Sequence, residues 1–410
     1  MRLPALPSFR SLKSFNYRLW AAGAVVSNIG TWMQRTAQGW LVLTELTHHD
    51  ASALGLTMAL QFAPPLLFLP LTGYVADHFN QRRLIMLTQA CMGCLALTLG
   101  ILTVTGLVSL WLVYLFAFLF GTASAFDAPT RQTFVSELAG DRDLSNAVAL
   151  NSLSFNGARM VGPAVAGLVI SAAGTGWAFI INGLSFGAVL CSLLFLRKAE
   201  LTPNARAHRA RGGFTEGFRY VWGRPDLRAI MCMLFVIGTF GMNFQLYIPA
   251  MATGAFHVNA EGFGLLSSFM AIGTILGAFA AAARIAPRFR NLLSSSMVFA
   301  IGCLFSAVAP GYWYFSAALV LTGIASMTFN NTTNSLAQLS TTPSLRGRVM
   351  AIRMAIAMGG TPIGAPLVGW ITDQFGPRWG MSIGAMAGTV ATIIALHAIA
   401  RRHHEVLDGD

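Results

Sequence analysis

The sequence has little charge and almost no lysine. Only 10% of its 410 residues are Asp, Glu, Lys or Arg, and Lys13 and Lys198 are the only lysines. Soluble domains carry charge on roughly a quarter of their residues, so the composition excludes an ordinary soluble globule. Intrinsic disorder is excluded because it needs low hydrophobicity, whereas 55% of this chain is apolar and its mean hydropathy is +0.61. A polytopic membrane protein remains.

Cysteine is scarce, and two common motifs, a nucleotide-binding loop and a zinc-protease motif, are missing. Cys91 and Cys94 form a C-x-x-C in an apolar run without further Cys or His partners, so we interpret them as core residues and expect no metal and no cofactor. Neither lysine follows a Gly, which excludes a G-x-x-x-x-G-K-[ST] nucleotide loop. No H-E-x-x-H motif occurs, and we expect that the protein is not an enzyme.

Long apolar runs separated by charged or Gly/Pro clusters predict twelve membrane-spanning helices. A span needs about 20 mostly apolar residues, and none of the runs alternates as a strand would. The expected fold class is therefore an all-α membrane protein. We place the spans near residues 18–44, 54–76, 84–105, 109–128, 145–172, 177–196, 228–254, 263–283, 292–309, 312–338, 347–372 and 379–400.

The charged loops alternate in sign. Loops on one side contain most of the arginines, whereas those on the other contain Glu45, Asp50, Glu261 and Asp373, with Arg378 as their only basic residue. The positive-inside rule then places both termini in the cytoplasm. Because the net charge of +12 lies mostly in these loops, it orients the chain in the lipid bilayer, and we do not expect nucleic acid as a partner.

The two halves of the sequence repeat each other. A shift of about 202 residues pairs Gly162, Gly174 and Trp177 with Gly364, Gly376 and Trp379. Nearer the start, an offset of about 208 pairs Gly30-Thr31 with Gly238-Thr239. This repeat predicts two pseudo-symmetric six-helix bundles, 1–197 and 227–410. The cytoplasmic linker 198–226 between them would contain a short amphipathic helix near Phe214–Trp222 at the membrane surface.

The loop after the second span carries a recognisable motif. It runs Gly73-Tyr-Val-Ala-Asp77-His-Phe-Asn80-Gln-Arg82-Arg83. This resembles the loop 2–3 signature of the major facilitator superfamily, with His78 in place of an Arg and Asn80 in place of a Gly. The resemblance implies that Gly73, Asp77, Arg82 and Arg83 form a conformational latch, in which Asp77 contacts the start of span 11 near Arg346–Val349.

Span 5 contains a second motif. Gly157, Gly162, Pro163 and Gly167 give it a smooth face suited to tight helix packing. This motif resembles a span 5 motif that is found in the exporters of the same superfamily. The chain as a whole resembles the branch of that superfamily that includes enterobactin and macrolide efflux proteins. The resemblance implies a bacterial inner-membrane transporter driven by an ion gradient, with protons as coupling ion. Ala117 stands where many drug/proton antiporters have an Arg.

Polar residues within the spans are the candidate site. In span 1 such residues fall on about one third of the helix circumference, and because this stripe is costly toward lipid we expect it to line a substrate cavity. An arginine inside the membrane costs about 2.5–3.5 kcal/mol on insertion scales, which indicates a functional or paired role. The candidates are Asn28, Thr31, Gln34, Arg35, Gln38, Arg159, Asn243, Asn330, Asn334 and Arg353.

Alternatives remain for two of the arginines. Arg159 fits cavity lining and bracing of backbone carbonyls equally well, and Arg353 is near enough to the cytoplasmic end to snorkel. No acid lies mid-membrane, because Asp127 is expected at a cytoplasmic helix end. The spans therefore contain arginines without acidic residues at the same depth, which favours a neutral or anionic substrate.

The sequence thus predicts a secondary transporter that exports a small organic molecule, drug-like or siderophore-like, by alternating access. Asp127 is the candidate for proton coupling, and we expect a monomer. Two alternatives are an importer of a small metabolite on the same fold and a polytopic membrane sensor or enzyme.

Overall fold

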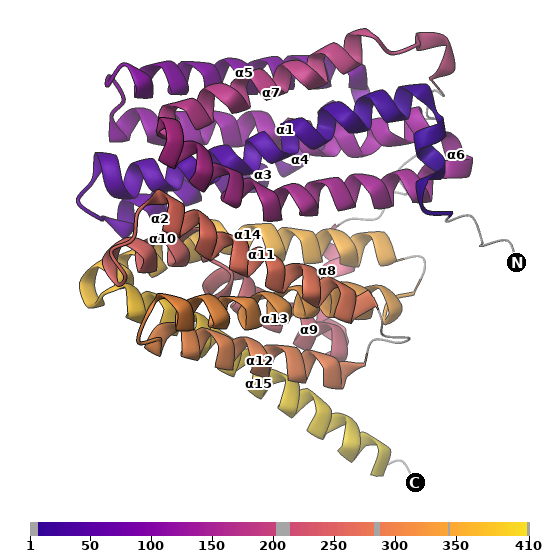
Figure 1. Ribbon diagram of the computed structural model, residues 1–410. Coiled ribbons are helices and arrows are strands. Elements are labelled where there is room, and N and C mark those ends of the chain that lie inside the picture. The colour runs from indigo at the N-terminus through magenta and orange to yellow at the C-terminus, as the bar shows by residue number, and fades with distance from the viewer. Residues whose placement is uncertain (1–6, 202–213, 283–287, 343–344, 408–410) are drawn as a thin grey trace, which may run out of the picture. The chain divides into compact units, whose positions relative to one another are not determined.

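The structure is a computed structural model that describes residues 7–201, 214–282, 288–342 and 345–407 (Figure 1). The described residues are overwhelmingly helical and include no strand. The chain divides into two compact units: Met1–Leu41 with Ala63–Arg209 is unit 1, and Val42–Phe62 with Ala210–Asp410 is unit 2. The assignment of the sequence halves 1–197 and 227–410 as domains stays a prediction.

The described residues of unit 1 form six α-helical elements and two short 3₁₀ turns. The turns are η1 (Pro7–Lys13) and η3 (Lys198–Glu200). The helices are α1 (Phe15–Trp40), α3 (Pro64–Leu67), α4 (Leu69–His78), α5 (Gln81–Val104), α6 (Leu110–Ala173) and α7 (Thr175–Leu194).

Unit 2 contains one helix from early in the sequence and all of the later ones. Two π-helical segments, η2 (Leu41–Leu46, beginning at the unit boundary) and η4 (Ile237–Gly241), interrupt the α-helices. The helices are α2 (Ala51–Phe62), α8 (Phe214–Gly223), α9 (Pro225–Val236), α10 (Phe244–Gly254), α11 (Ala260–Ala282), α12 (Phe289–Val308), α13 (Tyr312–Leu339), α14 (Arg346–Phe375) and α15 (Pro377–Leu407).

Ten helical stretches among the described residues are long and apolar enough to cross a membrane, and they match the third to twelfth predicted spans. The first span is α1, which has 26 residues but contains the polar stripe that lowers its hydropathy. The predicted second span, 54–76, is interrupted at Ala63 and Phe68. Pro64, Pro65 and Pro70 explain the interruption, because proline lacks an N–H and clashes with the preceding turn.

The loop expected between the fourth and fifth spans is largely helical. α6 runs from Leu110 to Gly140, turns there with φ 63° and ψ 170°, and continues to Ala173. Phe134, Val135 and Leu138 hold the extra turns in place, because they are buried against Tyr17, Trp20 and Ile85 among others. The prediction that span 4 ends near residue 128 is therefore wrong, and Arg131 lies inside a helix instead of in a loop.

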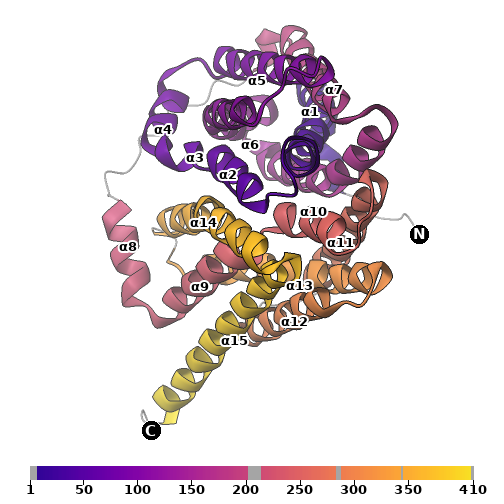
Figure 2. The ribbon, with the colours of Figure 1, turned by 90° about the vertical axis from the view of Figure 1, so that its left-hand side faces the viewer.

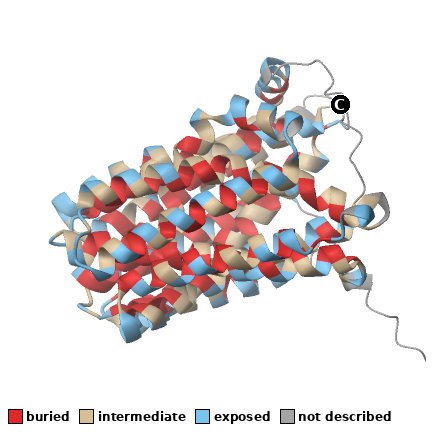
Figure 3. Cartoon of the chain, turned by 90° about the horizontal axis from the view of Figure 1, so that it is seen from above, coloured by how far each residue is buried: buried red, intermediate tan, exposed pale blue. Residues whose placement is uncertain are grey.

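Most of the long helices present a buried and an exposed face (Figure 3). The exposed faces carry large apolar side chains, such as Leu184 (65% exposed), Phe279 (70%) and Ile393 (59%). Water would disfavour apolar surface of this extent, whereas hydrocarbon accepts it. Exposed tryptophans mark several helix starts, Trp111 on α6, Trp313 on α13 and Trp379 on α15, which is typical of helix ends at a bilayer boundary.

The repeat inferred from the sequence has a close backbone counterpart. Gly174 joins α6 to α7 with φ 91° and ψ 169°, and Gly376 joins α14 to α15 with φ 99° and ψ 165°. Gly162 packs against the backbone of Met33, where an added Cβ would lie 3.0 Å from its nitrogen, and Gly364 packs against Thr239 in the same way. The two units therefore repeat one structural plan.

The amphipathic helix predicted near Phe214–Trp222 is confirmed as α8. Val221 is buried in a cluster with Leu227 and Val349, whereas Phe218 and Trp222 stack on each other at 5.4 Å and are exposed. In Figure 2, α8 lies along the edge of unit 2 beside α9. The linker arginines Arg206, Arg209 and Arg211 lie outside the described residues.

Gly174 and Gly376, which make the equivalent turns in the two units, provide a test of the repeat. We expect Gly174→Ala and Gly376→Ala each to lower the free energy of unfolding by about 1–3 kcal/mol, because a side chain strains this region of φ/ψ space. Thermal unfolding of the purified protein in detergent measures the loss. Gly157→Ala is the control, since a Cβ there meets no atom within 4 Å. Equal stability of all three variants would contradict the expectation.

Candidate functional site

The polar stripe of α1 divides into two sets of residues. Gln34 and Gln38 are both 2% exposed. Gln34 accepts a hydrogen bond from Asn182 of α7 at 2.6 Å, and Gln38 donates to the Val113 carbonyl of α6 at 3.5 Å. These two glutamines therefore connect helices within unit 1. Asn28, Thr31 and Arg35 are only partly buried, and Asn28 donates to the hydroxyl of Ser154 at 3.1 Å.

Arg35 lies against an aromatic side chain on its own helix. Its guanidinium carbon is 4.8 Å from the centroid of the Trp32 ring, a cation–π distance. Trp32 in turn packs edge-on against Phe155 of α6 at 5.7 Å. The guanidinium is thus positioned by a ring that α6 holds in place.

The glycine motif of α6 adjoins the same ring. Gly162 is buried against Trp32 and Met33, Gly167 is buried, and Pro163 lies within α6 without ending it. A Cβ added at Gly157 would meet no atom within 4 Å, so this glycine makes no comparable close contact. Arg159, one turn before Gly162, is partly buried and makes no hydrogen bond or ion pair within the described ranges. The close contact at Gly162 supports a packing role for that residue.

In unit 2, Arg353 joins two of the candidate helices. It is 8% exposed, and its Nη2 donates to the Asn330 backbone carbonyl at 3.1 Å and to the Asn330 side-chain oxygen at 2.6 Å. The third acceptor is the hydroxyl of Thr333 at 3.5 Å. α14 and α13 are linked by this arginine, whose head group lies among protein acceptors. Asn334, one turn beyond Asn330, is partly buried.

The seventh predicted span is interrupted where Asn243 lies. The π-helical segment η4 and the residues Met242 and Asn243 separate α9 from α10. Asn243 is fully buried and donates to the Thr239 carbonyl at 2.7 Å, whereas its side-chain oxygen has no partner within the described part of the chain. Single-turn π segments occur frequently at functional sites. The continuous span predicted over 228–254 did not anticipate this break.

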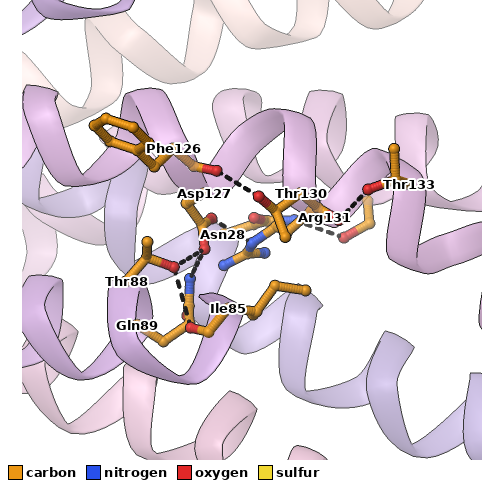
Figure 4. A network of polar contacts seen from close by, with 10 residues as sticks. Asn28, Ile85, Thr88, Gln89, Phe126, Asp127, Thr130, Arg131 and Thr133 are labelled. Carbon is orange, nitrogen blue, oxygen red and sulfur yellow. Dashed lines mark hydrogen bonds and ion pairs between the residues drawn. The ribbon is translucent and has the colours of Figure 1, made fainter. Parts of the chain in front are cut away.

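Asp127 lies in a network of polar contacts between α5 and α6 (Figure 4). One carboxylate oxygen accepts hydrogen bonds from Thr88 and Gln89 of α5, both at 2.8 Å. The other pairs with Nε of Arg131 at 2.6 Å, and the Arg131 guanidinium lies 5.6 Å from the Trp20 ring. With Asp127 only 6% exposed, this is a buried ion pair. Asp127 and Arg131 have the i,i+4 spacing of neighbours on a helix. The sequence predicts a loop at Arg131, however, and therefore does not predict this ion pair.

The loop 2–3 motif is described only in part. Gly73 and the side chain of Asp77 lie outside what the structure describes. Arg82 donates from Nε (2.9 Å) and Nη2 (2.6 Å) to the Leu193 carbonyl, which caps the C-terminus of α7. Asn80 accepts the Arg83 backbone N–H at 3.0 Å and so caps α5, while the Arg83 side chain is exposed.

The comparisons with known proteins agree with this architecture. A family model described as transmembrane secretion effector matches residues 8–409. The chain belongs to that family. It is 24% identical to the staphyloferrin A transporter of Staphylococcus aureus, covering 85% of this chain and 87% of that protein. It is 26% identical to the multidrug efflux pump Tap of Mycolicibacterium fortuitum, covering 86% and 88%.

The enterobactin exporter EntS of Escherichia coli is 23% identical, covering 82% of this chain and 80% of that protein. Among solved structures, a bacterial homologue of the lysosomal transporter Spinster, inward-facing and occupied, superposes with a TM-score of 0.73 at 15% identity, covering 97% of this chain and 98% of that one. The predicted resemblance to major facilitator exporters, the all-α membrane fold and the prediction of a small-molecule exporter are thereby confirmed.

The Asp127–Arg131 pair leads to a stability prediction for this family member. Asp127→Ala removes one charge and leaves Arg131 buried, so we expect a loss of about 3–5 kcal/mol in the free energy of unfolding. Arg131→Leu in the Asp127→Ala background restores part of that loss, because no uncompensated charge remains. Unfolding of the purified variants in detergent measures both changes.

Thr88→Val is the matched control, since it removes one hydrogen bond and costs about 1 kcal/mol. If the losses of Asp127→Ala and Arg131→Leu simply add in the double variant, the two residues do not act as a pair.

Proposed function

We propose that this protein exports a small organic molecule of the siderophore or drug class across a bacterial inner membrane. Both termini would lie in the cytoplasm, and the transporter would act as a monomer. The arginine distribution along the loops supports this orientation. The printed functions of the relatives, siderophore transport and multidrug efflux, support the substrate class.

Each unit supplies candidate residues for substrate binding. In unit 1 these are the partly exposed members of the α1 stripe, Asn28, Thr31 and Arg35, together with Arg159. In unit 2 they are Asn243, Asn330, Asn334 and Arg353. The observation that carries the proposal is Arg35 against Trp32, because a cation beside an aromatic face offers an anionic group an ion pair and a conjugated ring a stacking surface. Aromatic carboxylates and catecholates combine these two features.

Asp127 is the proposed coupling group. Its carboxylate is buried between α5 and α6 and balanced by Arg131. Proton uptake by Asp127 would cancel one side of that balance and release Arg131, so protonation and helix packing are linked at this point.

Accumulation measurements test the function. Cells expressing the protein should retain less of an exported catecholate siderophore than cells with the empty vector, and the difference should grow as the external pH is lowered, because proton antiport draws on that gradient. Asp127→Asn should lose the pH dependence. Increased retention on expression would instead favour an importer on the same fold.

Arg35 provides a test of substrate charge. We expect Arg35→Ala to lower the export rate of an anionic aromatic substrate about tenfold or more, the size expected for losing a charge-assisted contact. A neutral substrate of similar size should be affected less. Arg35→Lys, which keeps the charge, is the control for expression and folding. Equal losses for both substrates would assign Arg35 a structural role instead.

A further inference from the structure

An acidic side chain on α14 caps the N-terminus of α2. Asp373 lies in the last turn of α14, where the sequence suggests only a loop charge. Its two carboxylate oxygens accept the backbone N–H groups of Ala51 and Ser52, each at 2.7 Å. The Ser52 hydroxyl donates to the same carboxylate. α14 thus supplies acceptors for N–H groups that a helix start cannot satisfy internally.

The contact is charge-assisted in two ways. A carboxylate that accepts backbone N–H groups binds more strongly than a neutral acceptor, and the first turn of a helix carries the positive end of its dipole. A second carboxylate, Asp50, caps the same turn from within the segment by accepting the Ala53 N–H at 2.8 Å. α2 therefore has one local cap and one cap supplied by a helix more than 300 residues away in sequence.

Below this cap the two helices meet backbone to backbone. A Cβ on Gly55 would lie 2.9 Å from the Ala365 carbonyl carbon and 3.0 Å from the Pro366 Cα. A Cβ on Gly369 would lie equally close to Ala51 and Ser52. Small residues on both helices thus allow α2 to lie along α14, and Asp373 closes the end of this contact.

The packing of α2 is unexpected from its place in the chain. α1 precedes it and α3 follows it, and both belong to unit 1, whereas Val42–Phe62 belongs to unit 2. Asp373 is itself exposed and Ser52 only partly buried, so water can replace the three hydrogen bonds when they break. A contact of this kind can open and reform, unlike one sealed in the core.

We propose that Asp373 is a positioning residue for transport, which holds α2 on α14 in one access state and releases it in the other. This inference rests on the proposed alternating-access function. The loop 2–3 resemblance expects an acid, Asp77, to act at the opposite end of the same span; Asp373 supplies a counterpart at the end where α2 begins. The two acids would then favour opposite states.

A spin-label distance tests the proposal. Leu56 on α2 and Leu367 on α14 are exposed (41% and 49%), so cysteines at these positions in a variant lacking the five native cysteines accept labels without disturbing the contact. In Asp373→Ala we expect the population with separated labels to rise about tenfold, as for the loss of one charge-assisted interaction. Export rate should fall in the same variant.

Asp50→Ala is the matched control, because it removes the other carboxylate from the same helix start without touching α14. If Asp373 merely stabilised α2, both variants would behave alike, and the proposal would be overturned. Unchanged label distances in Asp373→Ala would overturn it too. A third outcome is that Asp373→Ala increases the population with separated labels while the parent protein shows no measurable export. This outcome would count against the proposed function and leave the role of Asp373 in the α2–α14 contact supported.

Discussion

Hydrocarbon offers no hydrogen-bond partner, so a backbone N–H or C=O group within the membrane is costly unless the protein itself supplies its partner. Hydrogen bonds within the regular helices satisfy most backbone groups. At helix ends, where such bonds are missing, side chains from other helices supply the partners. Arg82 caps the end of α7 through the Leu193 carbonyl, and Arg378 caps the end of α12 through the Ala307 carbonyl at 2.9 Å. Asp373 performs the opposite task at the start of α2. Long-range side chains thus complete helix ends that local residues leave open.

The same constraint explains where function can reside. An arginine or carboxylate in a span persists only if it is paired, capped or in contact with water or substrate. Asp127 is neutralised by Arg131 and held by two hydrogen bonds, and Arg353 is held by Asn330. Arg35 rests on an aromatic face, whereas Arg159 has no such partner within the described ranges. The arginines therefore differ in the interactions that the protein provides for their charge: an ion pair for Arg131, hydrogen bonds for Arg353 and an aromatic face for Arg35.

Patterns that depend on neighbouring residues were readable from the sequence. The amphipathic period over Phe214–Trp222 predicted α8, and the glycines at 174 and 376 marked equivalent turns because only glycine adopts their backbone angles easily. Contacts between distant residues were not readable. Nothing local indicates that the turns after residue 128 bury Phe134 against Trp20 at 5.4 Å, so sequence patterns predict a loop around Arg131 and do not predict its ion pair with Asp127.

By itself, the sequence determined that the chain spans the membrane many times, that its two halves repeat, and that it belongs with the major facilitator exporters. These properties follow from composition, from charge placement and from short motifs, all of which are local. Tertiary structure alone decided which polar groups meet: Asp127 with Thr88 and Gln89, Arg353 with Asn330, and Asp373 with the start of α2. The reason is physical, since a hydrogen bond depends on atoms within about 3 Å, and only packing of helices remote in sequence brings them that close.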